Sequence, residues 1–480
     1  MAETLKEKTT KGIIWSFIDK FGQQIIYLIS GIILARILTP NDYGLVGGIA
    51  IFIALASILT DSGFSRTLIN KQVVRQEEYS TVFYFNLVIS LIIYTLLFLC
   101  APFIAGFYKE PRLILIVRVH GLIVVFNAIS IIQNVLLAKK LDFKSQARYA
   151  LVALTFSTLI ALTLAYRQMG VWALVAQPFF FFLIKSLLLW GFSDWRPGLV
   201  FRWHIIKNLF AFANKLIAAS LINAFFNYIY YPIIGYFFNV SQLGYYVQAN
   251  RYHEIPSNLV SNTFRAVVAP VFAEVKEDNV RLKRVLSKNI QLISFIIFPV
   301  MCVFITIAEP FFLVLFKEKW LPSVPLFQVL CIGGMFTPFG FIMNELFIAK
   351  ERSDIYLGIE IAKKAILVGL IMALFYFGLI GLAASWSIYA FIALLIYLYY
   401  TSGTIEYTFW NFIKDSLGYF LISVVTCGIA GYISRYIPNN YFLILFNVFF
   451  VGIIYILVCY LCRLEACREV FTRVLNKKVV

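Results

Sequence analysis

The chain has 480 residues, of which 61% are hydrophobic and 14% are charged, and it includes 48 phenylalanines. Soluble domains average roughly 45–50% apolar residues, so this composition indicates a polytopic helical membrane protein. The long unbroken apolar runs exclude an outer-membrane barrel, whose strands alternate polar and apolar residues. A net charge of +17 could suggest a nucleic-acid partner, but the distribution of the basic residues argues against one.

Residues 1–11 are charged, and the apolar segment after them is too long for the core of a signal peptide. We therefore expect the first helix to be retained as an anchor. Most of the seven cysteines lie in apolar segments, where a thiol packs as a small hydrophobic group. The group Cys459, Cys462 and Cys467 has no histidine nearby, so we expect neither a metal site nor a disulfide.

Apolar segments separated by short polar breaks predict about fourteen transmembrane helices and an all-α fold. We place them at 12–38, 43–65, 79–106, 113–137, 149–166, 171–192, 206–238, 244–274, 289–316, 323–349, 354–377, 380–401, 414–434 and 441–462. The turns Thr39-Pro40-Asn41-Asp42 and Asn239-Val240-Ser241 each predict the end of one helix and a polar cap for the next.

Basic residues gather in every second break, which predicts the orientation of the chain. With both termini in the cytoplasm, the inner loops and tails hold 26 Lys and Arg residues and the outer loops hold 6. Omitting the polar eighth helix would invert every later loop and reverse this bias. The eighth segment is therefore expected to span the membrane.

Helices one and two weakly resemble helices seven and eight, which predicts two six-helix lobes, as in duplicated transporters. Phe17-Ile18-Asp19-Lys20 matches Phe212-Ala213-Asn214-Lys215, and Tyr43-Gly44-Leu45 matches Leu243-Gly244-Tyr245. The expected organisation is a cytoplasmic tail (1–11), a first lobe (12–192), a cytoplasmic linker (193–205), a second lobe (206–401), helices 13 and 14 (402–462) and a basic cytoplasmic tail (463–480).

The segment 244–274 has the length of a spanning helix but carries two arginines and a glutamate. On a helix, steps of three or four residues place its polar side chains on one stripe. The stripe consists of Gln248, Arg251, Glu254, Asn258, Asn262 and Arg265. An ionised side chain at the bilayer centre costs at least about 2.5–3.5 kcal/mol on insertion scales. The stripe therefore predicts one wall of a hydrated cavity in which Arg251 and Arg265 meet an anionic ligand.

Two other interpretations of this segment are open. It could be an interfacial or re-entrant helix held by internal ion pairs, or Glu254 could form a dry pair with one arginine. One carboxylate cannot neutralise two guanidinium groups, which favours a ligand. Asn, Ser and Tyr side chains also serve simply as contacts between helices.

Polar stripes on helices one and seven predict that both face the same cavity. In the first helix the stripe contains Asp19, Lys20, Gln23 and Tyr27, and in the seventh it contains Lys215, Asn223 and Asn227. Pro232 in the seventh helix and Pro256 in the eighth free backbone carbonyls, so they are candidate hinges or tolerated kinks.

Charged residues near the ends of other helices have a simpler explanation, since long side chains snorkel to the membrane surface. This explanation is expected for Lys185, Glu345, Glu360, Lys363 and Lys364. The sequence contains no Walker-type loop, no histidine-rich cluster and no long outer loop with an acidic pair. We therefore expect no catalytic site and no cofactor, and transport driven by a gradient of H⁺ or Na⁺.

Ordered motifs in the first 350 residues resemble a known family. LARILTPNDYGL at 34–45 is followed by DSGF at 61–64, GVWALV at 170–175, WRP at 195–197, LGYY at 243–246 and AEP at 308–310. Together they resemble the Wzx-type O-antigen and exopolysaccharide flippases of the multidrug/oligosaccharidyl-lipid/polysaccharide (MOP) exporter superfamily.

The resemblance implies a flippase of the bacterial inner membrane. It would move undecaprenyl-pyrophosphate-linked oligosaccharide repeat units from the cytoplasmic to the periplasmic leaflet by alternating access, for lipopolysaccharide, capsule or exopolysaccharide biosynthesis. The cations that hold the pyrophosphate or acidic sugars would be Arg251, Arg265, Lys20 and Lys215, and Asp19 and Glu254 are candidates for ion coupling. The expected partners are the lipid-linked oligosaccharide, the membrane and a polysaccharide polymerase or glycosyltransferases, with no nucleic acid, and the chain is expected to be a monomer.

Three alternatives remain open. A multidrug exporter of the same superfamily needs an acidic cavity for cationic drugs, whereas the intramembrane excess here is basic. A lipid II flippase fits the charge equally well. A membrane polymerase or glycosyltransferase that uses lipid-linked sugars needs a sizeable outer loop, which the predicted topology lacks.

Overall fold

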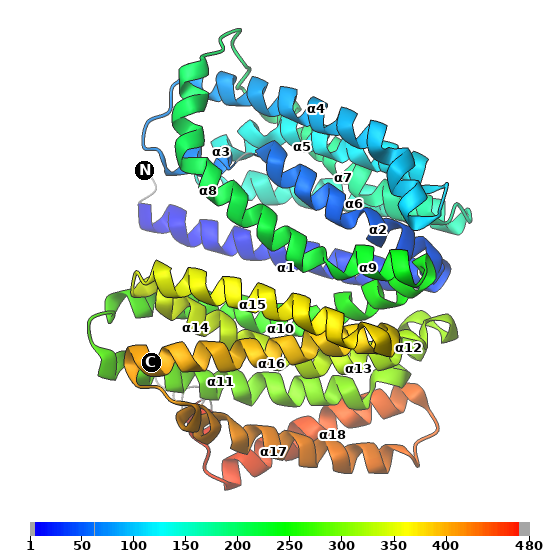
Figure 1. Cartoon of the computed structure of the whole chain (residues 1–480), viewed down its shortest axis with the longest axis vertical. Helices are drawn as coiled ribbons and strands as arrows, with labels where there is room; N and C mark the ends of the chain where they lie inside the picture. Colours follow the sequence, from blue (N-terminus) through cyan, green and yellow to red (C-terminus); the bar gives the residue numbers. More distant parts are fainter. Residues whose placement is uncertain (1–4, 62, 470–480) are drawn as a thin grey trace. The chain divides into compact units, whose positions relative to one another are not determined.

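A computed structural model describes residues 5–61 and 63–469, and every regular element in these ranges is a helix (Figure 1). The predicted tails 1–11 and 463–480 lie partly outside the described residues. The chain divides into two compact units, residues 1–244 and 245–480. The predicted boundary between the lobes 12–192 and 206–401 lies earlier in the chain, at the linker 193–205. The two lobes stay predictions.

The first unit is built around α2. Its helices are α1 (Leu5–Ile37), α2 (Pro40–Asp61), α3 (Phe64–Asn70), α4 (Gln76–Tyr108), α5 (Leu113–Lys139), α6 (Phe143–Tyr166), α7 (Val171–Phe192), α8 (Trp203–Tyr228), α9 (Tyr230–Phe237) and the first residues of α10 (Val240–Glu274). α2 packs against α4, α5, α7, α8 and α9, while α1 lies along α6. Leu45 and Ile49 of α2 join a buried cluster with Ile104, Val117 and Val175, so apolar burial holds these helices together.

The two predicted turns are confirmed. Asp42 accepts hydrogen bonds from the backbone nitrogen (2.9 Å) and the hydroxyl (2.7 Å) of Thr39, which orders the start of α2 directly after α1 ends. Asn239 accepts a hydrogen bond from the backbone nitrogen of Gln242 (2.7 Å) at the start of α10. Each polar side chain satisfies a backbone donor that the helix itself leaves free.

Two glycines allow the starts of α2 and α10 to cross backbone against backbone. A Cβ on Gly44 would lie 1.8 Å from the carbonyl oxygen of Val240, and a Cβ on Gly244 would lie 1.8 Å from that of Pro40. No side chain fits in either position, because real Cβ contacts are never so short. The motifs that the sequence matched to each other, at 43–45 and 243–245, therefore meet reciprocally.

The second unit contains most of α10 and the remaining helices. They are α11 (Asn279–Thr306), α12 (Ala308–Phe316), α13 (Ser323–Gly334), α14 (Thr337–Ala349), α15 (Ser353–Leu374), α16 (Gly378–Ile405), α17 (Phe409–Ser434) and α18 (Asn440–Leu461), with 3₁₀ turns η1 (Glu318–Trp320) and η2 (Phe375–Phe377). α13, α14 and α15 each pack against α16.

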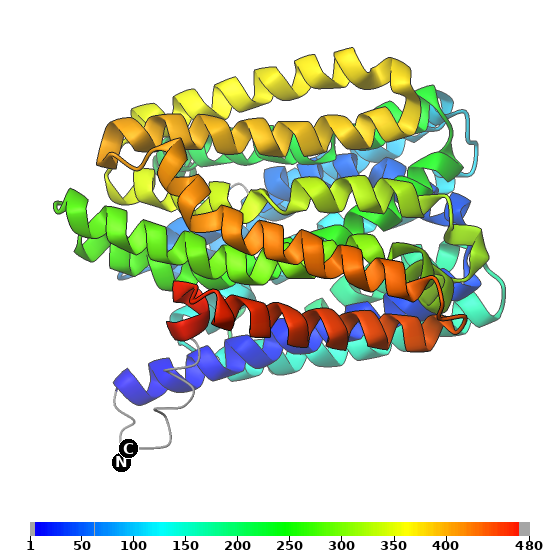
Figure 2. The same cartoon turned by 90° about the horizontal axis from the view of Figure 1, so that it is seen from below.

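The last two helices are joined to the second unit through α11. Figure 2 shows α17 and α18 running side by side, and both contact α11. Asp415 of α17 accepts hydrogen bonds from Ser287 Oγ (2.5 Å), Gln291 Nε2 (2.9 Å) and the hydroxyl of Tyr407 (2.7 Å). A carboxylate held by three neutral donors fixes the start of α17 against α11.

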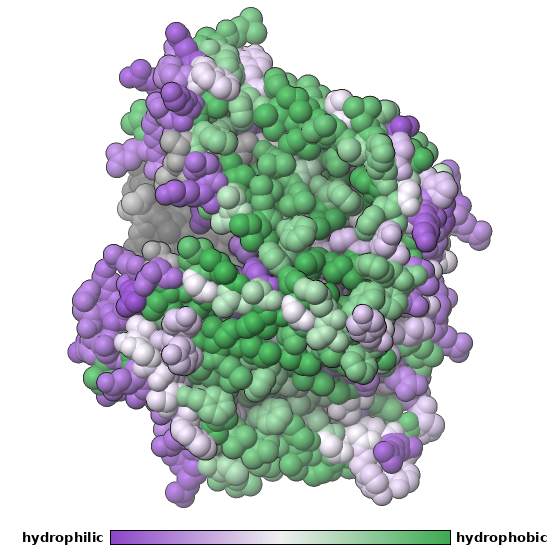
Figure 3. All heavy atoms as spheres, in the orientation of Figure 1, coloured by the Kyte–Doolittle hydropathy of each residue, from purple (hydrophilic) through white to green (hydrophobic). Residues whose placement is uncertain are grey.

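The predicted helical membrane fold is confirmed. Twelve segments of the described chain are long and apolar enough to cross a membrane. One of them, Asp354–Ile405, comprises both α15 and α16, and α10 is too polar to be counted although it has 35 residues. Counting these helices separately gives the fourteen that the sequence predicts. Figure 3 shows apolar helix shafts within each unit, with hydrophilic residues at the helix ends.

Candidate functional site

The polar stripe predicted for the mid-chain segment lies on one face of α10, and most of it is accessible. Its exposed or half-buried members are Arg251, Glu254, Asn258, Asn262 and Arg265. The opposite face of the helix packs into the second unit. Within this unit, α10 therefore turns its charged side chains away from the core, as a helix that lines a hydrated space must do.

Gln248 does not belong to this exposed face. Its side chain is fully buried (0% exposed), although the sequence predicted it on the same stripe. Because 3.6 residues complete a helical turn, Gln248 lies about a quarter of a turn away from Asn258. Gln248 lies three residues before Arg251, which places it at the edge of the predicted stripe. At that position its side chain packs into the core of the second unit.

The buried face of α10 carries two further polar side chains to which the sequence assigned no role. Ser257 Oγ donates a hydrogen bond to the carbonyl oxygen of Gly334 (2.8 Å), at the break between α13 and α14. His253 is also 0% exposed and lies edge-on against Trp386, with 4.8 Å between the ring centroids. These contacts hold α10 as an integral helix of the second unit.

Arg265 pairs with Glu345 of α14 and not with Glu254. Arg265 Nε lies 2.6 Å from Glu345 Oε1, and the two side chains are 53% and 8% exposed. Glu254 instead accepts a hydrogen bond from Asn250 Nδ2 (2.9 Å). The prediction that Glu345 snorkels to the membrane surface is wrong, because its carboxylate is buried against a guanidinium group from another helix.

Three more residues assigned to snorkelling form an ion-pair group inside α15. Glu360 Oε1 lies 2.6 Å from Lys363 Nζ, and Glu360 Oε2 lies 4.0 Å from Lys364 Nζ. The group begins two turns inside the helix, and its side chains are only 12% to 21% exposed. The prediction of snorkelling is therefore wrong here as well. Opposite charges at a spacing of three and four residues were the signal in the sequence that indicated this pairing.

The stripe on α1 is partly engaged within the first unit. Asp19 Oδ1 accepts a hydrogen bond from Gln23 Nε2 (2.7 Å). Lys185 of α7 lies over the ring of Phe181, with its Nζ 5.8 Å from the ring centroid, and that it snorkels stays a prediction. Lys20 is exposed, and Tyr27 packs against the buried cluster between α6 and α7.

The stripe on α8 is accessible. Lys215, Asn223 and Asn227 are all exposed. α8 ends at Tyr228, and Pro232 lies in the short helix α9 that follows, whereas Pro256 lies inside the continuous helix α10. That these side chains share one space with those of α10, and that the two prolines act as hinges, stay predictions.

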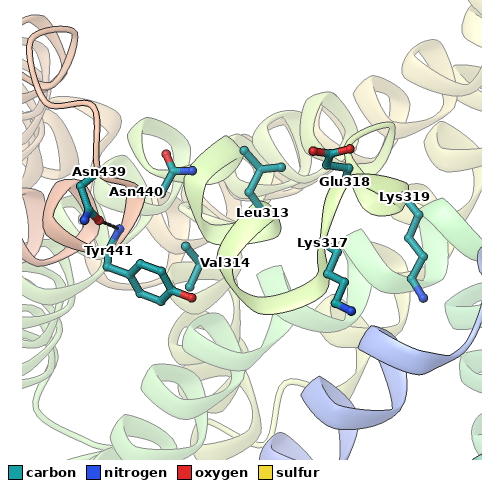
Figure 4. A pocket seen from close by; sticks show the side chains of 8 residues that line it. All are labelled: Leu313, Val314, Lys317, Glu318, Lys319, Asn439, Asn440 and Tyr441. Atoms are coloured by element: carbon teal, nitrogen blue, oxygen red, sulfur yellow. Dashed lines mark hydrogen bonds between the residues drawn. The ribbon is translucent and has the colours of Figure 1, made fainter.

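A separate open pocket of the second unit, with a volume of about 730 Å³, lies between the end of α12 and the start of α18 (Figure 4). Its lining residues are Leu313, Val314, Lys317, Glu318, Lys319, Asn439, Asn440 and Tyr441. Asn439 is occupied in capping α18, since it accepts hydrogen bonds from the backbone nitrogens of Tyr441 and Phe442. None of the predicted site residues lines this pocket. Within residues 5–61 and 63–469, no three His, Cys, Asp or Glu side chains are grouped to hold a metal ion.

Comparison with solved structures shows the fold. The lipid II flippase MurJ, in an inward closed conformation, is 14% identical and superposes with a TM-score of 0.78 over 96% of this chain and 99% of its own. An inward-facing multidrug resistance MATE transporter of the MOP superfamily is 16% identical, with a TM-score of 0.63 over 80% of this chain and 94% of its own.

Comparison of sequences identifies the family. The chain is 26% identical to the succinoglycan biosynthesis transport protein ExoT of Rhizobium meliloti, over 70% of this chain and 69% of that protein. It is 25% identical to the teichuronic acid biosynthesis protein TuaB of Bacillus subtilis, over 73% of both chains. It is also 25% identical to the lipopolysaccharide biosynthesis protein WzxC of Escherichia coli, over 73% of this chain and 72% of that protein.

The model of the family described as "Polysaccharide biosynthesis protein" matches residues 33–325. This range contains the motifs on which the resemblance to Wzx-type flippases was based, from the LARILTPNDYGL run to the AEP motif. The chain therefore belongs to the polysaccharide biosynthesis protein family and has the fold of the MOP exporters.

Proposed function

We propose that this protein is a flippase, and not an enzyme. It moves undecaprenyl-pyrophosphate-linked oligosaccharide repeat units from the cytoplasmic to the periplasmic leaflet of the bacterial inner membrane. The movement follows an alternating-access cycle, and the carried units serve lipopolysaccharide, capsule or exopolysaccharide biosynthesis. Both termini are cytoplasmic, and the chain acts as a monomer, supplying units to a polysaccharide polymerase.

The observation that carries this proposal is the accessible charged face of α10. Arg251 and Arg265 lie on that face, on a helix whose opposite face is packed among apolar spanning helices. Guanidinium groups bind phosphate oxygens through two parallel hydrogen bonds, which suits a pyrophosphate group. Lys20 of α1 and Lys215 of α8 are exposed cations of the first unit and would assist. Relatives named for succinoglycan transport and lipopolysaccharide biosynthesis support a glycan substrate.

Polar and aromatic side chains would hold the sugars. The candidates are Gln23, Asn223, Asn227, Asn258 and Asn262, with the ring of Tyr27 for stacking. Gln248 is not among the direct contacts, since its amide is buried. Asp19 and Glu254 would couple transport to H⁺ or Na⁺, because they are the carboxylates on the predicted polar faces.

The charge balance weighs against a multidrug exporter, whose cationic substrates would be repelled by two arginines. A lipid II flippase remains the second candidate, since the MurJ fold covers 96% of the chain and lipid II carries the same pyrophosphate group. The two are distinguished by the glycan that stops reaching the cell surface when the gene is deleted.

The test uses cells in which surface polysaccharide depends on this protein. Arg251→Ala and Arg265→Ala should abolish the polysaccharide while the protein stays inserted, and lipid-linked repeat units should accumulate on the cytoplasmic side. Arg281→Ala is the matched control, because Arg281 is exposed and lies at the start of α11 on the predicted cytoplasmic side. Normal polysaccharide in both α10 variants would contradict the proposal.

Ion coupling has its own measurement. In proteoliposomes loaded with a lipid-linked oligosaccharide, an imposed H⁺ or Na⁺ gradient should accelerate its appearance in the opposite leaflet. Asp19→Asn or Glu254→Gln should remove this acceleration. Rates that ignore both gradients would contradict coupling while leaving the flippase assignment intact.

A further inference from the structure

The open pocket between α12 and α18 (Figure 4) contains no residue of the charged face of α10. Its volume of about 730 Å³ is within the range of about 300–1,000 Å³ that is typical of small-molecule sites. Leu313 and Val314 supply apolar surface, and Lys317, Asn440 and Tyr441 supply polar groups. Ligand sites commonly combine apolar surface with a few polar groups in this way.

The backbone of Lys317 has a conformation that residues with a side chain rarely adopt. Its φ of 74° and ψ of 173° lie in a region that is essentially restricted to glycine. Lys109 and Glu406 also have positive φ angles, but with ψ angles of 34° and 25° they lie in the ordinary left-handed region. Lys317 is therefore the most strained of these three residues.

Buried aromatic side chains on both sides of Lys317 hold its backbone in place. Phe316 and Trp320 are both 0% exposed. The backbone nitrogen of Lys317 donates to the carbonyl oxygen of Leu313 (3.2 Å), and that of Trp320 donates to the carbonyl oxygen of Lys317 (3.2 Å). A strained residue persists only where the surrounding structure fixes it in this way.

The side chain of Lys317 needs an explanation other than stability, since glycine would adopt the same conformation without strain. The side chain is exposed, and its ammonium group has no hydrogen-bond or ion-pair partner in the part of the chain that the structure describes. Strained backbone is concentrated at active sites and ligand clamps. A cation held at the edge of a pocket by such a backbone indicates a ligand with an anionic group.

The other polar groups of the pocket indicate that the ligand also carries hydroxyl groups. The amide of Asn440 can donate and accept hydrogen bonds, and the carboxylate of Glu318 can accept them. Figure 4 shows Glu318 and Lys317 extending to opposite sides of the turn after α12, so the carboxylate does not neutralise the ammonium group. The ring of Tyr441 is 64% exposed and offers an apolar face at the same pocket.

We propose that this pocket binds an acidic oligosaccharide on the outer side of the membrane. The ammonium group of Lys317 binds a sugar carboxylate, and Asn440 and Glu318 bind hydroxyl groups. The ring of Tyr441 packs against the apolar face of a sugar ring. The distribution of basic residues predicts that the turns 317–322 and 435–440 face outward. The role of the site rests on the proposed function, because a glycan that has crossed the membrane meets the pocket on the side of delivery.

A simpler role for these groups would be to anchor the helix ends among lipid headgroups, as Lys and Tyr side chains do at membrane surfaces. That role needs exposed side chains only. It does not require a pocket, and it gives no reason for a lysine on backbone that suits glycine.

The test measures the binding of trigalacturonic acid, a chain of three acidic sugars, to the full-length protein in detergent by titration calorimetry. Lys317→Ala and Lys317→Gly should each weaken binding at least about tenfold, because a charge-assisted hydrogen bond is lost. Lys317→Gly should also unfold about 2 °C or more above Lys317→Ala, since only glycine relieves the backbone strain. Unchanged affinity in both variants, or a glycine variant no more stable than the alanine variant, would overturn the proposal.

The ring of Tyr441 provides a second variant. Tyr441→Ala should weaken binding at least about threefold, because the aromatic contact is lost. Two matched controls should leave the affinity unchanged. Lys109→Gly removes an exposed lysine at positive φ from another predicted outer turn, and Tyr376→Ala removes a ring that is 90% exposed and lies outside the pocket. Equal losses in the controls would reduce the effect to overall charge or exposed surface and overturn the site.

Two further probes identify the ligand. Maltotriose has three sugar rings without a carboxylate, and glycerol 3-phosphate has the anionic group of a phospholipid without its acyl chains. Each should bind at least about tenfold more weakly than trigalacturonic acid. Equal binding of maltotriose would remove the role of Lys317, and equal binding of glycerol 3-phosphate would assign the pocket to lipid headgroups; either result overturns the proposal.

Failure of this inference is distinguishable from failure of the proposed function. If Arg251→Ala and Arg265→Ala abolish surface polysaccharide while the Lys317 variants leave the affinity for trigalacturonic acid unchanged, only the inference fails. If both α10 variants leave the polysaccharide normal, the proposed function fails, whatever the pocket binds.

Discussion

The crossing of α2 and α10 predicts a severe effect of the smallest substitution available, Gly44→Ala. The added Cβ would lie 1.8 Å from the carbonyl oxygen of Val240 and 2.7 Å from its carbonyl carbon. Carbon–oxygen contacts in proteins settle near ~3.3 Å, so the two helix ends must separate by about 1.5 Å. Both partners are backbone atoms, and neither can move aside by changing a rotamer.

The expected loss is large for a single methyl group. Overpacking typically costs about 1–3 kcal/mol, and the immobility of the backbone puts this contact at the upper end. Replacing glycine by alanine in a helix recovers roughly 0.5–1 kcal/mol. The net loss for Gly44→Ala is therefore about 2 kcal/mol. Gly244→Ala should cost about the same, since its Cβ would lie 1.8 Å from the carbonyl oxygen of Pro40.

The assay is the free energy of unfolding of the purified protein, obtained by denaturant titration in detergent. Gly106→Ala in α4 is the control, because nothing lies within 4 Å of the added atom, and it should be neutral or slightly stabilising. The double variant Gly44→Ala, Gly244→Ala should lose much less than the sum of the single losses, since one separation relieves both clashes. Strict additivity, or a Gly44→Ala variant as stable as Gly106→Ala, would refute the reciprocal contact.

Three further predictions concern polar contacts. Asp415→Ala leaves three donors, one of them the buried phenol of Tyr407, without their acceptor and should lower the free energy of unfolding by about 2 kcal/mol; a loss below ~0.5 kcal/mol would contradict an anchoring role. Gln177 donates to Ser30 Oγ (3.2 Å) and Thr158 Oγ1 (3.0 Å), so Gln177→Leu should cost about 0.6–1.7 kcal/mol, which runs from the average to the largest value measured for hydrogen bonds between membrane helices. Lys276 lowers the pKa of Glu351 by donating a hydrogen bond to it, so the contact is present at neutral pH and is lost as the pH falls through that lowered pKa. If the free energy of unfolding is measured as a function of pH, the wild type should lose stability in this acidic range, and Glu351→Gln should not show this loss.

The fold could be predicted from the sequence because the length of an apolar run alone decides whether a helix can span a bilayer. The breaks inside three of the predicted helices were harder to predict, although each break has the same relation to a proline. α8, α11 and α13 end at Tyr228, Thr306 and Gly334, each four residues before a proline. A proline ring clashes with the carbonyl four residues earlier, which ends the helix there.

The same rule shows why a proline does not by itself predict a break. α4, α7 and α10 continue through internal prolines, including Pro256, because neighbouring helices and local adjustments tolerate the lost hydrogen bond. Pro232 and Pro256 therefore looked alike in the sequence, but only the first lies next to a helix end. Whether a helix ends before a proline or continues through it depends on tertiary packing, which the periodicity of the sequence does not reveal.

Part of the candidate site could also be predicted from the sequence. Helical periodicity identified the exposed face of α10, because charge on one face and apolar groups on the other reflect the environment of each side chain. The partner of Arg265 was not visible, since Glu345 lies 80 positions later in the chain and on another helix. A pairing between distant helices depends on tertiary contacts, and a single sequence contains no record of them.

The packing of α10 also bears on the alternative that it lies flat at the membrane surface. An interfacial helix needs one broad apolar face to enter the lipid and one polar face for water. α10 is polar on both sides, with Arg251 and Glu254 on the exposed face, the buried His253 on the opposite face and the buried Gln248 at the edge between them. A polar group buried in protein can find partners, as Ser257 does at Gly334, but the same group in acyl chains would find none. The buried face of α10 is thus built to meet other helices, and the exposed face can be tolerated at depth only where water or an anionic ligand reaches it.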